Sequence, residues 1–272
     1  MFNDIIIGQY IIGNSVIHRL DPRTKLILTI LLIIILFMIN NPILYLVFVA
    51  FITLVVKLSK IPPIYVLKGL KPMLFIVIFT VIINLFLTQG EPLFTLNLFS
   101  SFTITITKQG IIMSVLMFFR LFLLVSATSM LTLTTSPMLL TDGIENLLRP
   151  LRVIKVPSQE IAMMMSIAIR FIPTLAEETD KIKKAQTARG ADFESGNILR
   201  RAKSMIPLLV PLFVSAFRRA DELSVAMDAR CYNTSTKRTR LKELHFSNID
   251  LIAFLVTIAF VAIVFTIQYI MR

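Results

Sequence analysis

Residues 251–270 read LIAFLVTIAFVAIVFTIQYI, an apolar run that contains no charged side chain. The hydrocarbon core of a bilayer is about 30 Å thick, and a helix needs about 20 apolar residues to cross it. The rest of the chain is also apolar, since 56% of its 272 residues are hydrophobic and its mean hydropathy is +0.81. Soluble domains are about 45–50% apolar. The sequence therefore predicts an all-α polytopic membrane protein.

Four further apolar runs precede this one, and flanking Asn, Thr and Pro residues extend the first three to about 17 residues, the lower limit for a span. We expect about five transmembrane helices, four within residues 1–135 and one within 249–272. Between the third and fourth runs, Phe102, Ile104 and Ile106 alternate with threonines, which predicts a small extracellular β-hairpin at about 92–108, with an irregular loop as the alternative. The four runs cover residues 26–39, 43–56, 73–87 and 111–133.

The basic residues indicate the orientation of the chain. Lys and Arg number 28 against 16 Asp and Glu, a net charge of +12. They gather before the first run, between the second and third, and in segment 136–248, so the positive-inside rule places the N-terminus and this segment in the cytosol and the C-terminus outside. In such an apolar chain we attribute the charge to the inner face of the plasma membrane and not to a nucleic-acid partner. A single cysteine, Cys231, excludes an intrachain disulfide.

Segment 136–248 predicts two long helices, 158–189 and 197–230. In the first, apolar residues recur at steps of three and four and charged residues occupy the opposite face, which is typical of a helix that lies on a surface. The second contains the apolar run 205–217, which is too short to span a bilayer.

Both helices end in the same way. The first ends Ala188-Arg189-Gly190 and the second Ala229-Arg230-Cys231. A single arginine of this kind is an ordinary helix end, because it complements the helix dipole and Gly suits the position that follows. Two such ends in one segment predict two cationic tips, and arginine is suited to bidentate contact with a partner's carboxylates or carbonyls.

Several stretches together resemble the transmembrane (T) component of energy-coupling factor (ECF) transporters. The resemblance covers nearly the whole chain. It rests on GQY at 8–10, SVIHRLDPRTK at 15–25, LTLTTSPMLLTDGIENLLRPL at 131–151, MMSIAIRFIPTLAEE at 164–178, AQTARGADFESG at 185–196 and PLLVPLFVSAFRRADELSVAMDA at 207–229.

The resemblance implies a membrane scaffold that joins two ABC ATPases to a small substrate-binding membrane subunit, the S component, in an importer of vitamins or related micronutrients. Family members dock in grooves of the two ATPases through Ala-Arg-Gly tips, which correspond here to 188–190 and 229–231. The second departs from the pattern at Cys231, where a backbone angle that favours glycine would be strained. ATP is used by the partner ATPases; no cofactor, metal or catalytic residue is expected in this chain, which has no phosphate-binding Gly-x-x-x-x-Gly-Lys loop.

The surface that grips the S component is expected on the apolar faces of the two long helices. These faces could instead pack against the spans of the protein itself. The residues concerned are Met164, Ala168, Ile172, Leu208 and Leu212.

Two rival functions have weaker support. A self-contained secondary transporter usually keeps ionisable groups within the membrane, but the five runs contain no Asp, Glu or His. An intramembrane enzyme needs a buried catalytic cluster, and both histidines, His18 and His245, lie outside the runs. Arg120 is the one charge within a run: it either contacts the S component or a helix-end carbonyl, or it reaches to the membrane interface.

Overall fold

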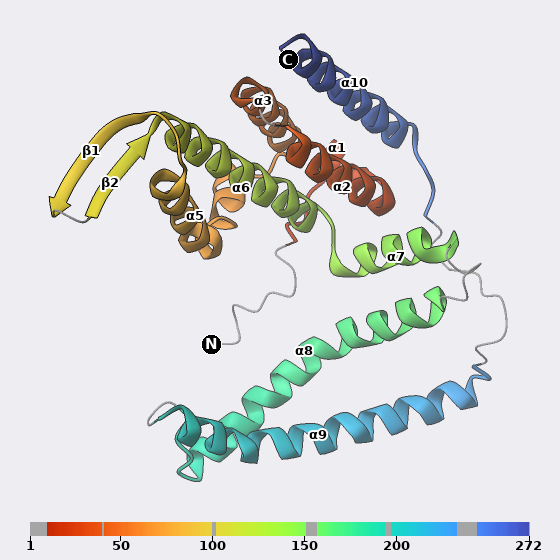
Figure 1. Ribbon diagram of the computed structural model, residues 1–272. Coiled ribbons are helices and arrows are strands. Elements are labelled where there is room, and N and C mark those ends of the chain that lie inside the picture. The colour runs from red at the N-terminus through yellow and green to blue at the C-terminus, as the bar shows by residue number, and fades with distance from the viewer. Residues whose placement is uncertain are drawn as a thin grey trace. The chain divides into compact units, whose positions relative to one another are not determined.

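The structure is a computed structural model, and it describes residues 10–39, 41–99, 102–150, 157–193, 197–232 and 244–271. Helices dominate the described chain, with one pair of strands (Figure 1). In order, the elements are α1 (Val16–Arg19), α2 (Pro22–Met38), α3 (Pro42–Ser59), α4 (Pro63–Lys68), the 3₁₀ turn η1 (Lys71–Met73), α5 (Leu74–Leu87), β1 (Pro92–Phe99), β2 (Phe102–Thr107), α6 (Lys108–Thr134), α7 (Pro137–Leu148), α8 (Ser158–Ala188), α9 (Ile198–Ala229) and α10 (Asn248–Ile270).

Local sequence sets where the apolar helices begin. The Asp21 side chain caps α2 by accepting the Arg23 N–H at 2.8 Å, and proline follows it at the first helical position. Asn41 caps α3 in the same way, again before a proline. An Asx cap followed by Pro is favourable because the cap satisfies a free N–H and the ring pre-sets the helical φ.

Four helical stretches of the described chain are long and apolar enough to cross a membrane: Pro42–Ser59, Pro63–Leu87, Lys108–Thr134 and Asn248–Ile270. The first predicted run lies in α2, which has 17 residues and is about 26 Å long at 1.5 Å per residue. That length is at the short end for a span. The structure thus supports a membrane protein with four clear candidate spans, and the fifth span stays a prediction.

The strands β1 and β2 pair antiparallel, with Thr95 opposite Thr105 and Leu96 opposite Ile104. They occupy the region where the sequence predicts a hairpin. The residues that join them, 100–101, lie outside the described residues, and the placement of the pair on the outer surface stays a prediction.

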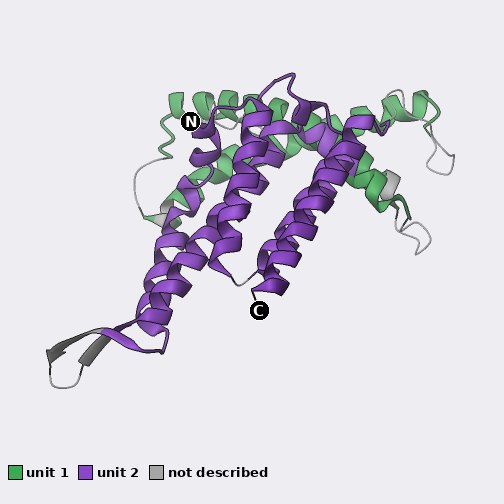
Figure 2. Cartoon of the chain, turned by 90° about the horizontal axis from the view of Figure 1, so that it is seen from above, with its two compact units in different colours: residues 1–7, 144–243 green, residues 8–143, 244–272 purple. Residues whose placement is uncertain are grey.

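The chain divides into two compact units, residues 1–7 with 144–243 and residues 8–143 with 244–272 (Figure 2). The second unit has its core where α2, α3, α6 and α10 meet, around fully buried side chains such as Leu44, Leu123 and Val264. Phe260 of α10 stacks on Phe51 of α3 with ring centroids 4.1 Å apart. These contacts bring the C-terminal helix against helices that precede it by more than a hundred residues.

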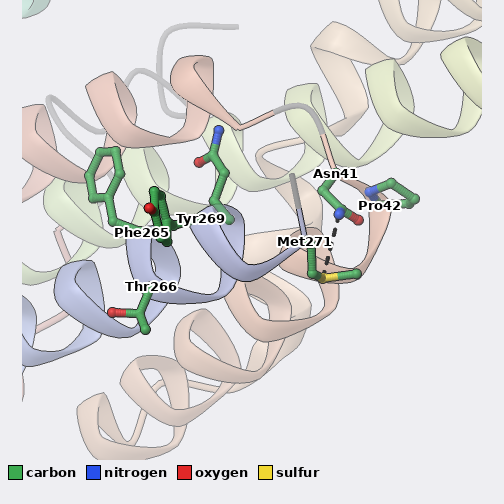
Figure 3. A pocket seen from close by; sticks show the side chains of 7 residues that line it. Asn41, Pro42, Phe265, Thr266, Tyr269 and Met271 are labelled. Carbon is green, nitrogen blue, oxygen red and sulfur yellow. Dashed lines mark hydrogen bonds between the residues drawn. The ribbon is translucent and has the colours of Figure 1, made fainter.

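A groove lies where the end of α10 faces the start of α3 (Figure 3). The Asn41 amide donates to the Met271 sulfur at 3.5 Å, and the Gln268 amide donates to the Met38 carbonyl at 3.3 Å. The two bonds tie the last turn of α10 to the connection between α2 and α3.

Candidate functional site

The end of α8 is a Schellman motif, the six-residue turn that reverses the chain after a helix. The Gly190 N–H donates to the Thr187 carbonyl at 2.9 Å, and the Ala191 N–H donates to the Gln186 carbonyl at 3.0 Å. Gly190 has a φ of +89°. The motif requires a left-handed residue at this position, which glycine adopts without steric cost.

The end of α9 repeats this geometry with cysteine in place of glycine. The Cys231 N–H donates to the Asp228 carbonyl at 2.9 Å, and the Tyr232 N–H donates to the Met227 carbonyl at 3.0 Å. Cys231 has a φ of +54°. The strained angle expected from the sequence is therefore present, and a left-handed non-glycine residue costs about 1–3 kcal/mol.

Arg189 and Arg230 are the matching cap residues of the two helices, with φ of −86° and −91°. Both are exposed, as are the small residues on either side of each. Within the part of the chain that the structure describes, neither guanidinium has a hydrogen-bond or ion-pair partner. Each arginine therefore projects five free N–H donors from the negative end of a helix dipole, an arrangement ready to bind carbonyl or carboxylate oxygens.

Helices α8 and α9 pack antiparallel, which separates the two arginines. The Tyr232 hydroxyl, just after α9, lies 2.6 Å from the sulfur of Met163, near the start of α8. A groove between the helices is lined by Ile167 of α8 and by Met227 near the end of α9. Because α8 has 31 residues and so extends about 47 Å, the arginines lie at opposite ends of a long helical pair.

A polar contact joins the middles of the two helices. The Ser215 hydroxyl donates to one carboxylate oxygen of Glu178, and the Arg219 guanidinium donates to the other at 3.1 Å. The Ser215 hydrogen bond lowers the pKa of Glu178 below its ordinary value of 4.5; partial burial opposes this effect, and the positive charge of Arg219 adds to it. The sequence did not predict this contact. Glu177 and Glu178 are neighbouring glutamates, and only the fold shows that Glu178 is the one that meets α9.

The ten residues that end with each cap arginine differ in charge. Residues 180–189 carry one acidic residue and four basic ones, whereas residues 221–230 carry three acidic residues and one basic one. The backbone of the two tips is thus alike, but the helix turns that precede them have net charges of opposite sign. The α8 group is Asp180, Lys181, Lys183, Lys184 and Arg189, and the α9 group is Asp221, Glu222, Asp228 and Arg230.

Known proteins match this chain along its length. The family described as "Cobalt transport protein" (CbiQ) matches residues 13–241. An energy-coupling factor transporter transmembrane protein of Ruminiclostridium cellulolyticum is 54% identical over 270 residues, 99% of each chain. A protein of the same name from Clostridium kluyveri is 51% identical over 97% of this chain and 96% of its own, and one from Bacillus subtilis 45% identical over 97% and 98%. This chain belongs to the T components of ECF transporters.

The resemblance stated from the sequence is thereby confirmed, and the T component is a membrane subunit of a transporter. Of its residues expected to contact an S component, Met164 and Ile172 are 60% and 42% exposed, and Ala168 is also exposed. Leu212 is half-buried, and Leu208 is 8% exposed. The α8 residues thus present a free apolar surface, whereas Leu208 presents almost none.

Arg120 of the T component has partners within the chain. Its Nε donates to the Tyr45 hydroxyl at 3.0 Å, and its Nη2 donates to the Ile39 carbonyl at 3.0 Å. Ile39 is the cap residue at the end of α2. Arg120 therefore binds a helix-end carbonyl, which the sequence offered as a partner beside the S component. Tyr45 also donates to this carbonyl, at 3.1 Å, so the arginine belongs to an internal polar cluster.

A second buried polar cluster was missed from the sequence. Asp250 accepts the Asp21 N–H at 2.8 Å, which joins the start of α10 to the start of α2. Asp21 forms an ion pair with Arg23 at 2.8 Å, and Arg23 donates to the Leu244 carbonyl at 2.9 Å. The stretch SVIHRLDPRTK supplied part of the family resemblance, but its partners lie more than two hundred residues away.

No group of three or more His, Cys, Asp or Glu side chains in the described ranges is placed to hold a metal ion. The candidate site of this T component is the pair of exposed arginine tips on α8 and α9.

Proposed function

We propose that this T component is the scaffold subunit of an ATP-driven micronutrient importer in the plasma membrane. In this proposal two ABC ATPases bind the tips at Arg189 and Arg230, and an S component binds the apolar surface of α8 and α9. ATP is hydrolysed by the ATPases, and this chain contributes no catalytic residue or cofactor. Transported vitamins are selected by the S component.

One observation carries the proposal: two Schellman ends with the same hydrogen bonds lie at opposite ends of one antiparallel pair, and each presents an arginine that has no partner among the described residues. A rigid pair of this kind can transmit motion of two docked subunits to a membrane partner. The opposite charge behind the two tips fits two ATPases with different docking surfaces, because electrostatic complementarity discriminates between partners.

The topology is part of the proposal. Helix α2 and the four candidate spans together make five crossings, with the N-terminus and the α8–α9 pair in the cytosol and the C-terminus outside. The basic loops support this orientation.

The test is affinity purification of the chain from its native membrane, with mass spectrometry of the proteins that accompany it. We expect two different ABC ATPases and one or more small hydrophobic proteins. The double variant Arg189→Ala/Arg230→Ala should insert normally but lose both ATPases and ATP-dependent uptake. Intact assembly and uptake in the double variant would refute the docking role, and uptake by the chain alone in liposomes would favour a secondary transporter.

A further inference from the structure

An apolar groove in the second unit has a buried cation in its lining. Its walls come from α1, α2, α3, α6 and α10, and its volume is about 210 Å³. Leu54 of α3 and Ile252 and Val256 of α10 line it and are 51%, 57% and 49% exposed. On a membrane protein, an open groove with such walls is accessible to hydrocarbon chains and not to water.

Among the described residues that line the groove, Lys25 is the only charged one, and it is 7% exposed. Its ammonium group donates to the Thr134 carbonyl at 2.8 Å and to the His18 carbonyl at 3.2 Å. An ammonium group has three N–H donors, so one remains.

No described carboxylate forms a direct ion pair with this buried cation. Among the described residues, no carboxylate lies within 4.0 Å of the Lys25 ammonium. The two nearby acids have other partners: Asp21 is paired with Arg23, and Asp250 accepts the N–H groups of Asp21 and Ser247, both at 2.8 Å. A buried charge is costly unless it is paired. Asp250 and Asp21 attract the Lys25 charge without direct contact, so an anion that accepts the remaining N–H directly would stabilise it further.

The groove occupies one leaflet. Its lining residues lie at the start of α2 and α10 and at the end of α3 and α6, which the proposed orientation places at the cytosolic face. Residues 249–257 of α10 extend about 12 Å, close to half of a hydrocarbon core of about 30 Å. Anionic lipids are enriched in this leaflet, and basic pockets between membrane helices bind their headgroups.

We propose that this groove binds an anionic phospholipid of the inner leaflet. One acyl chain lies between α3 and α10, and the headgroup phosphate accepts the remaining Lys25 N–H. Bound in this way, the lipid fills the gap beside α10 and ties the C-terminal helix to the rest of the unit.

The test uses the full-length chain, purified and then incorporated into nanodiscs made of equal parts phosphatidylglycerol and phosphatidylcholine. After detergent extraction, native mass spectrometry counts the lipids retained. We expect one phosphatidylglycerol retained at least about fivefold over phosphatidylcholine, the preference that one cation near a membrane surface provides. Lys25→Met should abolish the preference, whereas Lys71→Met, which alters an exposed lysine of η1, should leave it unchanged.

A second variant keeps the test decisive if Lys25→Met does not fold. Val256→Trp fills the groove from an exposed position and should release the lipid while Lys25 stays intact. The proposal would be overturned if the two lipids were retained equally, or if either groove variant kept the preference. It would also be overturned if inorganic phosphate, in lipid-free detergent, stabilised the chain against heat as much as phosphatidylglycerol does.

Discussion

The ends of α8 and α9 have the same backbone and different side chains. Each forms a Schellman turn after a small-Arg pair, but the left-handed residue is Gly190 in one and Cys231 in the other. The preceding turns of α8 are basic and those of α9 are acidic. In the proposed docking mode each ATPase contacts an arginine held at the cap of a helix. The different charge behind each tip would discriminate between the two ATPases.

The largest expected effect separates the two tips. Arg189→Ala and Arg230→Ala should each remove one ATPase and leave the other bound. Loss of hydrogen bonds to a charged group costs about 1.5–3 kcal/mol, so we expect the affinity for the lost ATPase to fall about 10- to 100-fold, as measured by co-purification and quantitative binding. Arg218→Ala, an exposed arginine within α9, is the control. Loss of both ATPases from either single variant would show that the tips do not act separately.

The next effect concerns the left-handed residues and should have opposite sign at the two tips. Gly190→Ala introduces a Cβ that meets no atom within 4 Å, so its cost of about 1 kcal/mol comes from the backbone alone. Cys231→Gly should relieve strain of similar size. Amide hydrogen exchange of Ala191 should become about fivefold faster in the first variant, and that of Tyr232 about fivefold slower in the second. A shift in the same direction in both would contradict the shared geometry.

A smaller effect concerns the contact that holds the two helices together. Because the pKa of Glu178 is lowered in the folded state, its contribution to stability is present above its ordinary pKa of 4.5 and is lost as the pH falls through the lower folded value. Hydrogen exchange across α8 and α9 should therefore speed up as the pH falls below about 4.5, after correction for the intrinsic pH dependence of exchange. Glu178→Gln should remove this dependence, and an unchanged pH profile in this variant would assign it to another group.

The smallest effect concerns the anchor of the α9 tip. Tyr232→Phe keeps the ring but removes the hydroxyl that contacts the sulfur of Met163. We expect a loss of stability of about 0.5 kcal/mol, measured as a lower thermal midpoint in detergent. Tyr65→Phe, a change on an exposed tyrosine, is the control and should leave the midpoint unchanged. An equal shift in both variants would show that the contact between Tyr232 and Met163 does not stabilise the protein.

The sequence by itself determined the local features of this protein. The apolar runs predicted the membrane helices, and the two long helices end within one residue of their predicted limits. Caps, prolines and apolar periodicity act over a few residues, so they can be read from neighbours in the chain. The left-handed angle at Cys231 was also expected, because the Ala229-Arg230-Cys231 end repeats the Ala188-Arg189-Gly190 pattern.

Only the tertiary structure decided which distant groups meet. It placed the arginine tips at opposite ends of an antiparallel pair, joined Glu178 to Ser215 and Arg219, and gave Arg120 the Ile39 carbonyl as its partner. It also placed Lys25 in the lining of an apolar groove, where no carboxylate of the described residues pairs with it directly. These contacts join residues 37 to 81 positions apart, and no local spacing determines which buried polar groups satisfy one another; only the packing of the helices does.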